Sequence, residues 1–101
     1  MGTMGALEQR IQNSILRYLR RQPETWAFKA DVSTRGIPDV ICVHCGRFVL
    51  FEVKQPGRKP STIQIANMRL ARTAGAEAYA VESLAEVKEI LAAPPAKRPV
   101  I

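Results

Sequence analysis

One segment, GIPDVICVHCGRFVLFEVKQ, constrains what this chain can fold into more than any other. The runs VICV and RFVLFEVK are rich in β-branched and aromatic residues, which is typical of β-strands, and HCGR lies between them as a turn. The segment therefore predicts an antiparallel hairpin. Its ends carry charges, because Asp39 precedes the first strand and Glu52 and Lys54 lie near the end of the second.

The register of this hairpin decides whether those charges meet. A turn of even length pairs His44 with Arg47, and Asp39 then faces Glu52. Opposed side chains have Cβ atoms roughly 4.5–5.5 Å apart. A three-residue turn would shift the pairing by one residue and set Asp39 opposite an apolar residue. The polar and apolar faces predicted for the two strands would then no longer match. We therefore predict the even turn, with Lys54 on the same face as Glu52.

The paired carboxylates indicate a cation site. Two carboxylates at that separation repel each other unless a cation lies between them, and a divalent metal with oxygen ligands meets that need. The alternative is that Asp39 caps a turn after Pro38, while Glu52 and Lys54 form an ordinary exposed pair. We favour the site because four apolar residues share the face, which is therefore expected to be buried, and a buried carboxylate pair is costly without a partner. Those four residues are Ile41, Val43, Phe48 and Leu50.

The two cysteines, Cys42 and Cys45, suggest other chemistry that the surrounding residues do not support. Structural zinc needs four ligands, and the chain has only one His, His44, inside the same turn; completion by carboxylates would be unusual. A redox CxxC normally opens a helix after a strand, whereas Gly46 and strand-forming residues follow Cys45. We interpret the pair as reduced cysteines in and beside the turn.

The rest of the chain completes an α/β pattern. Ser61 and Ser83 each begin a capping box, Pro23 ends the first helix, and Gly75 is a natural stop for the second. We expect helices over 5–21, 61–74 and from 83 onward, and strands over 26–32, 40–43, 47–54 and 76–82. This order favours a mixed central sheet flanked by helices, with a right-handed crossover between the last two strands.

Length and charge narrow the class of protein. The 101 residues fit one domain, which we place at 5–92, followed by a Pro-rich basic tail at 93–101 that we expect to be flexible. No apolar run approaches the roughly 20 residues of a transmembrane helix, and the first residues lack a signal-peptide core, so we expect a cytoplasmic or nuclear-type soluble protein. A net charge of +6 favours a nucleic-acid partner over a merely solvated basic surface.

Several of these residues together resemble a known family. Gly36-Ile37-Pro38-Asp39, then Glu52-Val53-Lys54, a basic loop and Gln64 on a helix are similar to the VRR-NUC (virus-type replication-repair nuclease) domain. This family belongs to the PD-(D/E)XK, restriction-endonuclease-like superfamily. The resemblance extends from Glu8 to the Val81-Glu82-Ser83 turn. It implies a restriction-endonuclease-like α/β fold of order αβββαβ(α) and a nuclease dependent on Mg²⁺ or Mn²⁺.

The resemblance also implies roles for individual residues. Asp39 and Glu52 would be metal ligands, together with the backbone carbonyl of Val53. Lys54 would orient or activate the attacking water, and Gln64 would position water or phosphate. The last site residue that the resemblance implies is Glu8, a possible further metal ligand. It matches the acidic residue of the family's first helix and lies on the same helix face as the apolar stripe. The alternative for Glu8 is an ordinary surface residue.

Basic residues near the predicted site indicate how DNA is held. Arg35 precedes Gly36, and Arg58 and Lys59 follow Gly57, so both loops can approach phosphates closely. Lys29 is a further candidate contact. Phosphate contacts position a duplex without reading its sequence, and no recognition helix is evident, so we expect structure-selective cutting.

The expected substrate follows from the resemblance. Small stand-alone members of the family resemble junction-resolving enzymes that act as homodimers, so branched DNA such as a four-way (Holliday) junction is expected, with flaps or other branched DNA as the alternative. The rival interpretations are a non-catalytic nucleic-acid-binding module on the same fold and a small interaction or antitoxin-like protein. The presence of all the site residues disfavours the module, and the interaction protein predicts no divalent-metal binding.

Overall fold

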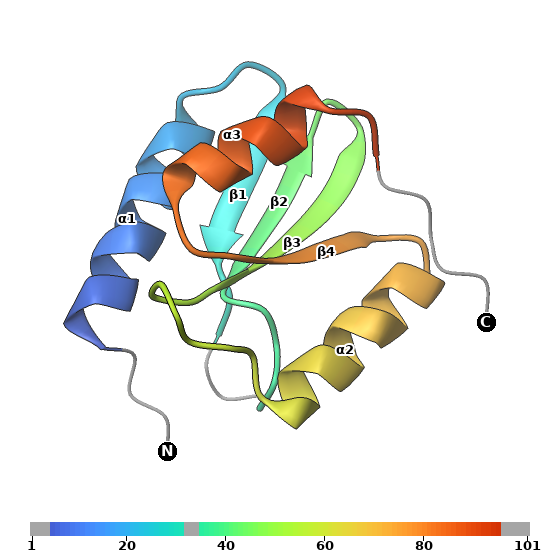
Figure 1. Ribbon diagram of the computed structural model, residues 1–101. Coiled ribbons are helices and arrows are strands. Elements are labelled where there is room, and N and C mark those ends of the chain that lie inside the picture. The colour runs from blue at the N-terminus through green and yellow to red at the C-terminus, as the bar shows by residue number, and fades with distance from the viewer. Residues whose placement is uncertain (1–4, 32–34, 96–101) are drawn as a thin grey trace.

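The computed structural model describes residues 5–31 and 35–95, which form a single mixed sheet with helices on both faces (Figure 1). The elements in chain order are α1 (Ala6–Arg20), β1 (Thr25–Lys29), β2 (Val40–His44), β3 (Arg47–Val53), α2 (Thr62–Thr73), β4 (Glu77–Val81) and α3 (Leu84–Ala92). No helix within the described ranges has the length and apolar character that a bilayer span requires. Val32 of the predicted first strand and residues 96–101 of the predicted tail lie outside the described residues.

The strands are ordered β1-β2-β3-β4, with antiparallel pairing from β1 to β3 and parallel pairing between β3 and β4. α2 connects the two parallel strands. α1 and α3 pack on one sheet face, where the larger core contains fully buried side chains such as Ile15, Leu19, Val40, Phe51 and Val87. α2 packs on the other face over a smaller core of Leu50, Met68, Ala76 and Ala78. The predicted mixed α/β fold is confirmed.

The hairpin has the predicted register. His44 pairs with Arg47, and every pair along β2 and β3 follows from that match. The two central turn residues, Cys45 and Gly46, have φ angles of 49° and 82°, as a two-residue hairpin turn of type I′ requires. The even turn therefore places the Asp39 end of β2 beside the Glu52 end of β3.

Two local predictions needed correction. β1 ends at Lys29 rather than at residue 32, although Ala30 N still donates to the Asp39 carbonyl at 2.8 Å. The capping box at Ser61 is complete, but the one predicted at Ser83 is only half formed. The Ser83 hydroxyl accepts from Glu86 N, while the Glu86 carboxylate accepts from Glu82 N instead of from the cap residue.

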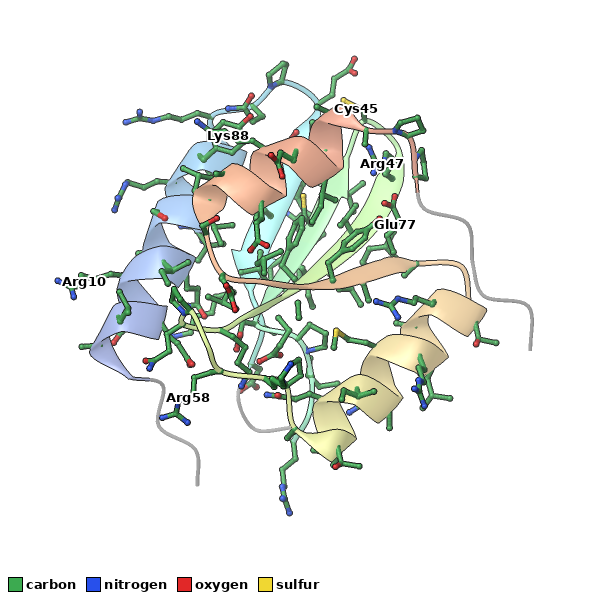
Figure 2. All side chains as sticks on the ribbon, viewed as in Figure 1. Arg10, Cys45, Arg47, Arg58, Glu77 and Lys88 are labelled. Carbon is green, nitrogen blue, oxygen red and sulfur yellow. The ribbon has the colours of Figure 1, made fainter. Side chains whose placement is uncertain are left out.

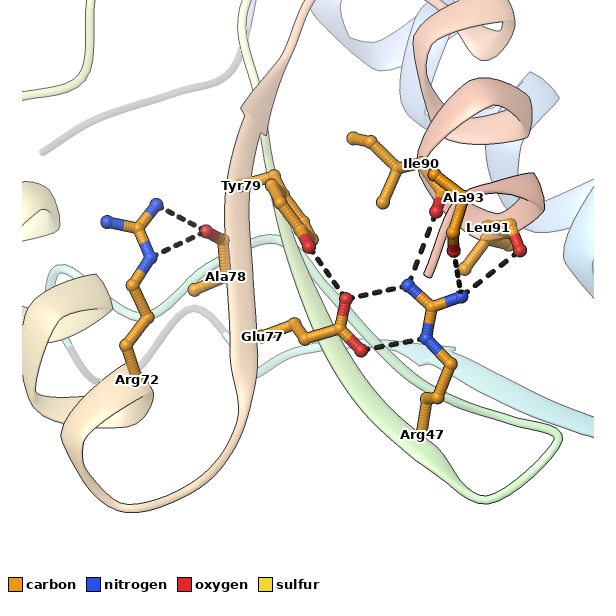
Figure 3. Close-up of polar contacts among 8 residues, drawn as sticks. All are labelled: Arg47, Arg72, Glu77, Ala78, Tyr79, Ile90, Leu91 and Ala93. Carbon is orange, nitrogen blue, oxygen red and sulfur yellow. Dashed lines mark hydrogen bonds and ion pairs between the residues drawn. The ribbon is translucent and has the colours of Figure 1, made fainter. Parts of the chain in front are cut away.

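The sheet face that carries Glu52 is less buried than the sequence predicts. Leu50 is buried against α2, but Phe48 is 50 % exposed and Ile41 and Val43 are only half-buried. The reason is the position of α2, which lies over the β4 side of the sheet. Arg72 of α2 holds it there, since its Nε donates to the Ala78 carbonyl at 3.0 Å (Figure 3).

A partly buried arginine, with a side chain that is 15 % exposed, ties the end of the hairpin to the last helix. Arg47 donates from Nε and Nη2 to the two carboxylate oxygens of Glu77 at 2.8 and 2.7 Å, and Tyr79 donates to the same carboxylate (Figure 3). The bond from Arg47 holds the pKa of Glu77 below its usual value. The other Arg47 donors reach carbonyls at the C-terminus of α3, those of Ile90, Leu91 and Ala93. This cation therefore caps α3, where helix carbonyls lack partners.

Candidate metal centre

Glu52 is the most unusual side chain in the fold, because it is a carboxylate that is only 2 % exposed. Its Oε2 accepts a hydrogen bond from Gln64 Nε2 at 2.9 Å and lies 3.5 Å from Lys54 Nζ. Its Oε1 is buried and has no hydrogen-bond partner among the described residues. A buried acceptor without a partner costs stability, so it calls for an ion or another ligand to explain it.

Asp39 lies at the same end of the hairpin and is fixed by the backbone of β3. Its Oδ2 accepts from Val53 N at 2.7 Å, which draws the carboxylate across toward Glu52. Burial, and then the charge of Asp39, raise the pKa of Glu52 to about 8. Burial also raises the pKa of Asp39, opposed by the bond from Val53 N. Burial and mutual repulsion therefore both disfavour full ionisation of the pair unless a cation lies beside it.

Gln64 belongs both to this centre and to the start of α2. Its side-chain Oε1 accepts from Ser61 N at 2.8 Å, and its backbone N donates to the Ser61 hydroxyl at 3.2 Å, which completes the capping box. The same side chain donates through Nε2 to Glu52. The local signal that begins the helix thus also fixes the amide against the buried carboxylate.

Glu8 lies beside the carboxylate pair but does not join it. Its Oε2 accepts from Gln55 N at 3.3 Å, on the residue after Lys54. Its negative charge contributes to the raised pKa of Asp39, so the two carboxylates interact electrostatically. Within the described residues, no group of three or more His, Cys, Asp or Glu side chains is close enough to hold one metal. Glu8 is therefore an outer neighbour of the Asp39–Glu52 pair.

Asn67 helps to place the site, and sequence reasoning missed it. Its Nδ2 donates to the Arg35 carbonyl at 3.4 Å, which seats the loop before Asp39 on α2. A Cβ on Gly36 would lie 2.5 Å from Asn67 Nδ2 and 2.9 Å from Ile63 Cγ1, so the loop can approach α2 this closely only with glycine. The available signal was spacing, since Asn67 follows Gln64 by three residues and lies on a neighbouring part of the helix face.

The predicted DNA contacts occupy different positions around the centre. Arg35, Arg58 and Lys59 are exposed on the loops before β2 and before α2, and Figure 2 shows Arg58 at the edge of the molecule. Lys29 is exposed too, but it lies two residues after Ala27 on β1 and so shares its sheet face, where Ala27 is buried under α1. Its side chain therefore belongs to the sheet face opposite Glu52.

The cysteines lie at the other end of the hairpin. Cys42 is buried in the larger core, and burial raises the pKa of its thiol to about 11. Cys45 is exposed in the turn, far from Arg58 in Figure 2. The His44 Nδ1 is 2.8 Å from the Thr25 hydroxyl, so the histidine is engaged with β1.

Comparisons with known proteins place the fold. No family model and no curated protein matches the chain. A solved structure described as "VRR_NUC domain" is 22 % identical, with a TM-score of 0.74 over 87 % of this chain and 97 % of that one. Another, described as "VRR_NUC domain protein", is 14 % identical, with a TM-score of 0.71 over 89 % of this chain and 88 % of that one. The chain therefore has the fold of the VRR_NUC domain, as its sequence pattern predicts.

Proposed function

We propose that the protein is a Mg²⁺- or Mn²⁺-dependent, structure-selective DNA endonuclease that hydrolyses phosphodiester bonds. The observation that carries the proposal is the Glu52 carboxylate, whose Oε2 is held by Gln64 while its buried Oε1 has no hydrogen-bond partner among the described residues. A divalent cation that prefers oxygen ligands fits this atom and the adjacent Asp39. The likeness in fold to the VRR_NUC structures supports a nuclease.

The proposed ligands are Asp39, Glu52 and the backbone carbonyl of Val53. Val53 N donates to Asp39, and the N–H and C=O of one strand residue point toward the same neighbouring strand, so we expect its carbonyl on the Asp39 side. Glu8 would act from outside this set. When bound, the ion supplies charge neutralisation at the phosphate and lowers the pKa of the attacking water.

The chain's own residues supply the remaining requirements. Lys54 brings a positive charge to within 3.5 Å of Glu52, where it can orient the attacking water and stabilise the negative charge that develops on the phosphate. Gln64 holds Glu52 in one orientation through its amide N–H. A carboxylate fixed by a second side chain needs no rearrangement when its ligand binds.

The proposed substrate is DNA, which the protein would recognise by its shape and not by its base sequence. The net charge of +6 and the exposed loop residues Arg35, Arg58 and Lys59 favour phosphate contacts, which do not read sequence. Lys29 would contribute only from the far face of the edge strand. A branched DNA such as a four-way junction suits a homodimer, since each copy cuts one strand.

The test is a panel of linear, flap, splayed and four-way DNAs, each incubated with Mg²⁺, Mn²⁺ or EDTA. We expect cleavage of a branched member that EDTA and Asp39→Ala both abolish, while the matched surface variant Cys45→Ser keeps it. Undiminished cleavage by Asp39→Ala would overturn the site. Tight junction binding without metal-dependent cutting would instead support a non-catalytic DNA-binding module.

A further inference from the structure

The sheet face that carries Glu52 is open on its β1 and β2 side. Among the described residues, α2 is the helix packed on this face, and it buries Leu50, Ala76 and Ala78. These residues belong to β3, to the segment just before β4 and to β4. On β1 and β2 the residues of the same face are half-buried or exposed. The open area therefore adjoins the candidate site on one continuous sheet face.

The open area is aromatic. Strand pairing aligns Trp26 with Val43 and Val43 with Phe48, in one row across three strands. Trp26 is 63 % exposed and Phe48 is 50 % exposed. Phe28 lies beside Trp26, with ring centroids 4.9 Å apart. We refer to Trp26, Phe28 and Phe48 as the aromatic face. An exposed cluster of large apolar side chains is typical of a surface that binds a ligand.

Apolar side chains connect the aromatic face to the candidate metal centre. Ile41 and Leu50 are paired, and alternation places them on the same face, one step from the row of Phe48 toward Glu52. Glu52 follows Phe48 by four residues, which is roughly 13 Å along a strand. Within the described residues of β1, β2 and β3, Glu52 is the first charged side chain on this path. A ligand that spans the path therefore meets an uncharged surface and then the metal centre.

The positive charges gather at the metal-centre end of this path. Lys54 Nζ lies 3.5 Å from Glu52, and Arg35, Arg58 and Lys59 are exposed on the loops before β2 and after β3. A DNA strand offers both kinds of group, because its phosphates are negative and its bases are flat and uncharged. Proteins that bind single strands combine cations for the phosphates with aromatic side chains on which bases stack. The order of cations and rings along this face fits such a strand.

We propose that the aromatic face is a subsite for unpaired nucleobases of the DNA strand whose backbone lies at the metal centre. The inference rests on the proposed function and specifies its substrate further. A protein seated on this face would cover Glu52, whereas DNA has to lie there to be cut. The chain also carries a charge of +6, which attracts DNA and repels a second copy.

The subsite selects among branched DNAs. Bases inside a duplex stack on one another, so their flat faces are not available to a protein, whereas a flap, a gap or a splayed arm exposes them. At a rise of roughly 3.4 Å per nucleotide, the 13 Å path corresponds to about four nucleotides. The preferred substrate should therefore carry unpaired nucleotides within about four positions of the cut, and a fully paired four-way junction should be cut more slowly.

The first experiment measures DNA binding in EDTA, so that its outcome does not depend on cleavage. Trp26 is the single tryptophan of the chain, and its fluorescence therefore reports on this face alone. Oligothymidylate of about 12 nucleotides should quench Trp26, while a blunt duplex of the same length should bind with little quenching. By anisotropy of labelled DNA, Trp26→Ala and Phe48→Ala should each weaken oligothymidylate binding by roughly 10-fold and duplex binding by less than about 2-fold.

A matched control separates the aromatic face from general hydrophobic exposure. Ile65 is 38 % exposed on α2 and, by helix spacing, lies toward Arg72 and the β4 edge. Ile65→Ala should bind oligothymidylate as the wild type does, and circular dichroism should show that both face variants remain folded. With Mn²⁺, the face variants should lose the preference for splayed or gapped DNA over the fully paired junction.

The outcomes distinguish the subsite from its rivals. Equal quenching by duplex and single strand, or unchanged oligothymidylate affinity in both face variants, would overturn the inference. A dimer that forms without DNA and that Trp26→Ala dissociates, seen by sedimentation equilibrium, would also overturn it and assign the face to a second copy. Quenching by oligothymidylate without any metal-dependent cutting would support the base subsite and contradict the nuclease proposal instead.

Discussion

Gln64 donates from Nε2 to Oε2 of the buried Glu52 at 2.9 Å while its Oε1 accepts from the backbone of Ser61. The Gln64 side chain thus provides a hydrogen-bond acceptor for the backbone N–H at the N-cap of α2. It also provides a donor for one oxygen of the candidate metal ligand Glu52. The two partners can be separated by mutation, because Ser61 is hydrogen-bonded to Gln64, whereas Glu52 accepts only from the Gln64 side-chain amide within this set of three residues.

Ser61→Ala and Gln64→Ala should therefore differ in metal binding more than in stability. Each removes part of the capping box and should cost about 1 kcal/mol in the free energy of unfolding. Only Gln64→Ala also frees Glu52, so only this variant should weaken Mn²⁺ binding, by roughly 10-fold or more. Chemical denaturation and isothermal titration calorimetry measure the two effects. Equal Mn²⁺ affinities for the two variants would contradict a role for Gln64 in the centre.

The raised pKa of Glu52 predicts how stability depends on pH. Because the folded pKa is about 8 and the ordinary value is 4.5, the folded state holds a proton that the unfolded state releases between these values. The contribution of Glu52 to the free energy of unfolding of the metal-free protein should therefore be greatest below about pH 4.5. It should fall by a few kcal/mol as the pH rises to about 8. Thermal denaturation in EDTA measures this slope.

Glu52→Gln supplies the control for that slope, because its amide does not titrate. The variant should melt at a nearly constant temperature over the same pH range and should exceed the wild type above pH 8. Divalent metal should reduce the slope in the wild type alone, since binding requires the ionised carboxylate. A slope that survives in Glu52→Gln would assign the titration to another group.

Gly36→Ala tests the contact between the Asp39 loop and α2. Gly36 has φ 79°, and a Cβ there would meet Asn67 Nδ2 at 2.5 Å and Ile63 Cγ1 at 2.9 Å. Gly57→Ala is the matched control, since Gly57 has φ 88° with nothing within 4 Å of its Cβ position. Both variants should lose about 1–2 kcal/mol from the backbone conformation. Only Gly36→Ala should lose more and also weaken Mn²⁺ binding, as calorimetry of the two variants would show.

The part of the candidate site that could be predicted from sequence is the part that is local to the hairpin. Strand alternation and the even turn place Asp39 beside Glu52, and the capping pattern identifies Gln64 at the start of a helix. The contact of Asn67 with the Arg35 carbonyl depends instead on the position and orientation in which α2 packs against the sheet. No local pattern specifies that placement, because packing between distant segments decides it.

The same limit explains the error in predicted burial. The apolar residues on the Glu52 face suggested a covered sheet, but in the described part of the chain α2 is the helix packed on this face, over its β4 side. Arg72, which reaches the Ala78 carbonyl, fixes α2 on that side. The exposed Phe48 that results is a property of tertiary packing, and alternation along β3 alone could not reveal it.

Arg47→Lys should show how much the tie between the hairpin and α3 contributes to stability. The Arg47–Glu77 pair is largely buried, with side-chain exposures of 15 % and 10 %, and lysine cannot reproduce the two parallel bonds. We expect a loss of about 3 kcal/mol in the free energy of unfolding. Arg69→Lys, at an exposed position of α2, should change it little. Mn²⁺ affinity measured below the melting range should be unaffected in both, because Arg47 lies at the turn end of the hairpin.

Lys54 gives the sharpest separation of metal binding from catalysis. Its ammonium is close to Glu52 but cannot ligate a cation, so Lys54→Gln removes a positive charge without removing a ligand. Mn²⁺ should therefore bind the variant at least as tightly as it binds the wild type, while cleavage of branched DNA falls by roughly 100-fold or more. Lys59→Gln, which removes an exposed loop charge, should weaken DNA binding modestly and leave the cleavage rate at saturating DNA intact. Single-turnover cleavage together with Mn²⁺ titration distinguishes these outcomes, and wild-type cleavage by Lys54→Gln would remove this residue from the reaction.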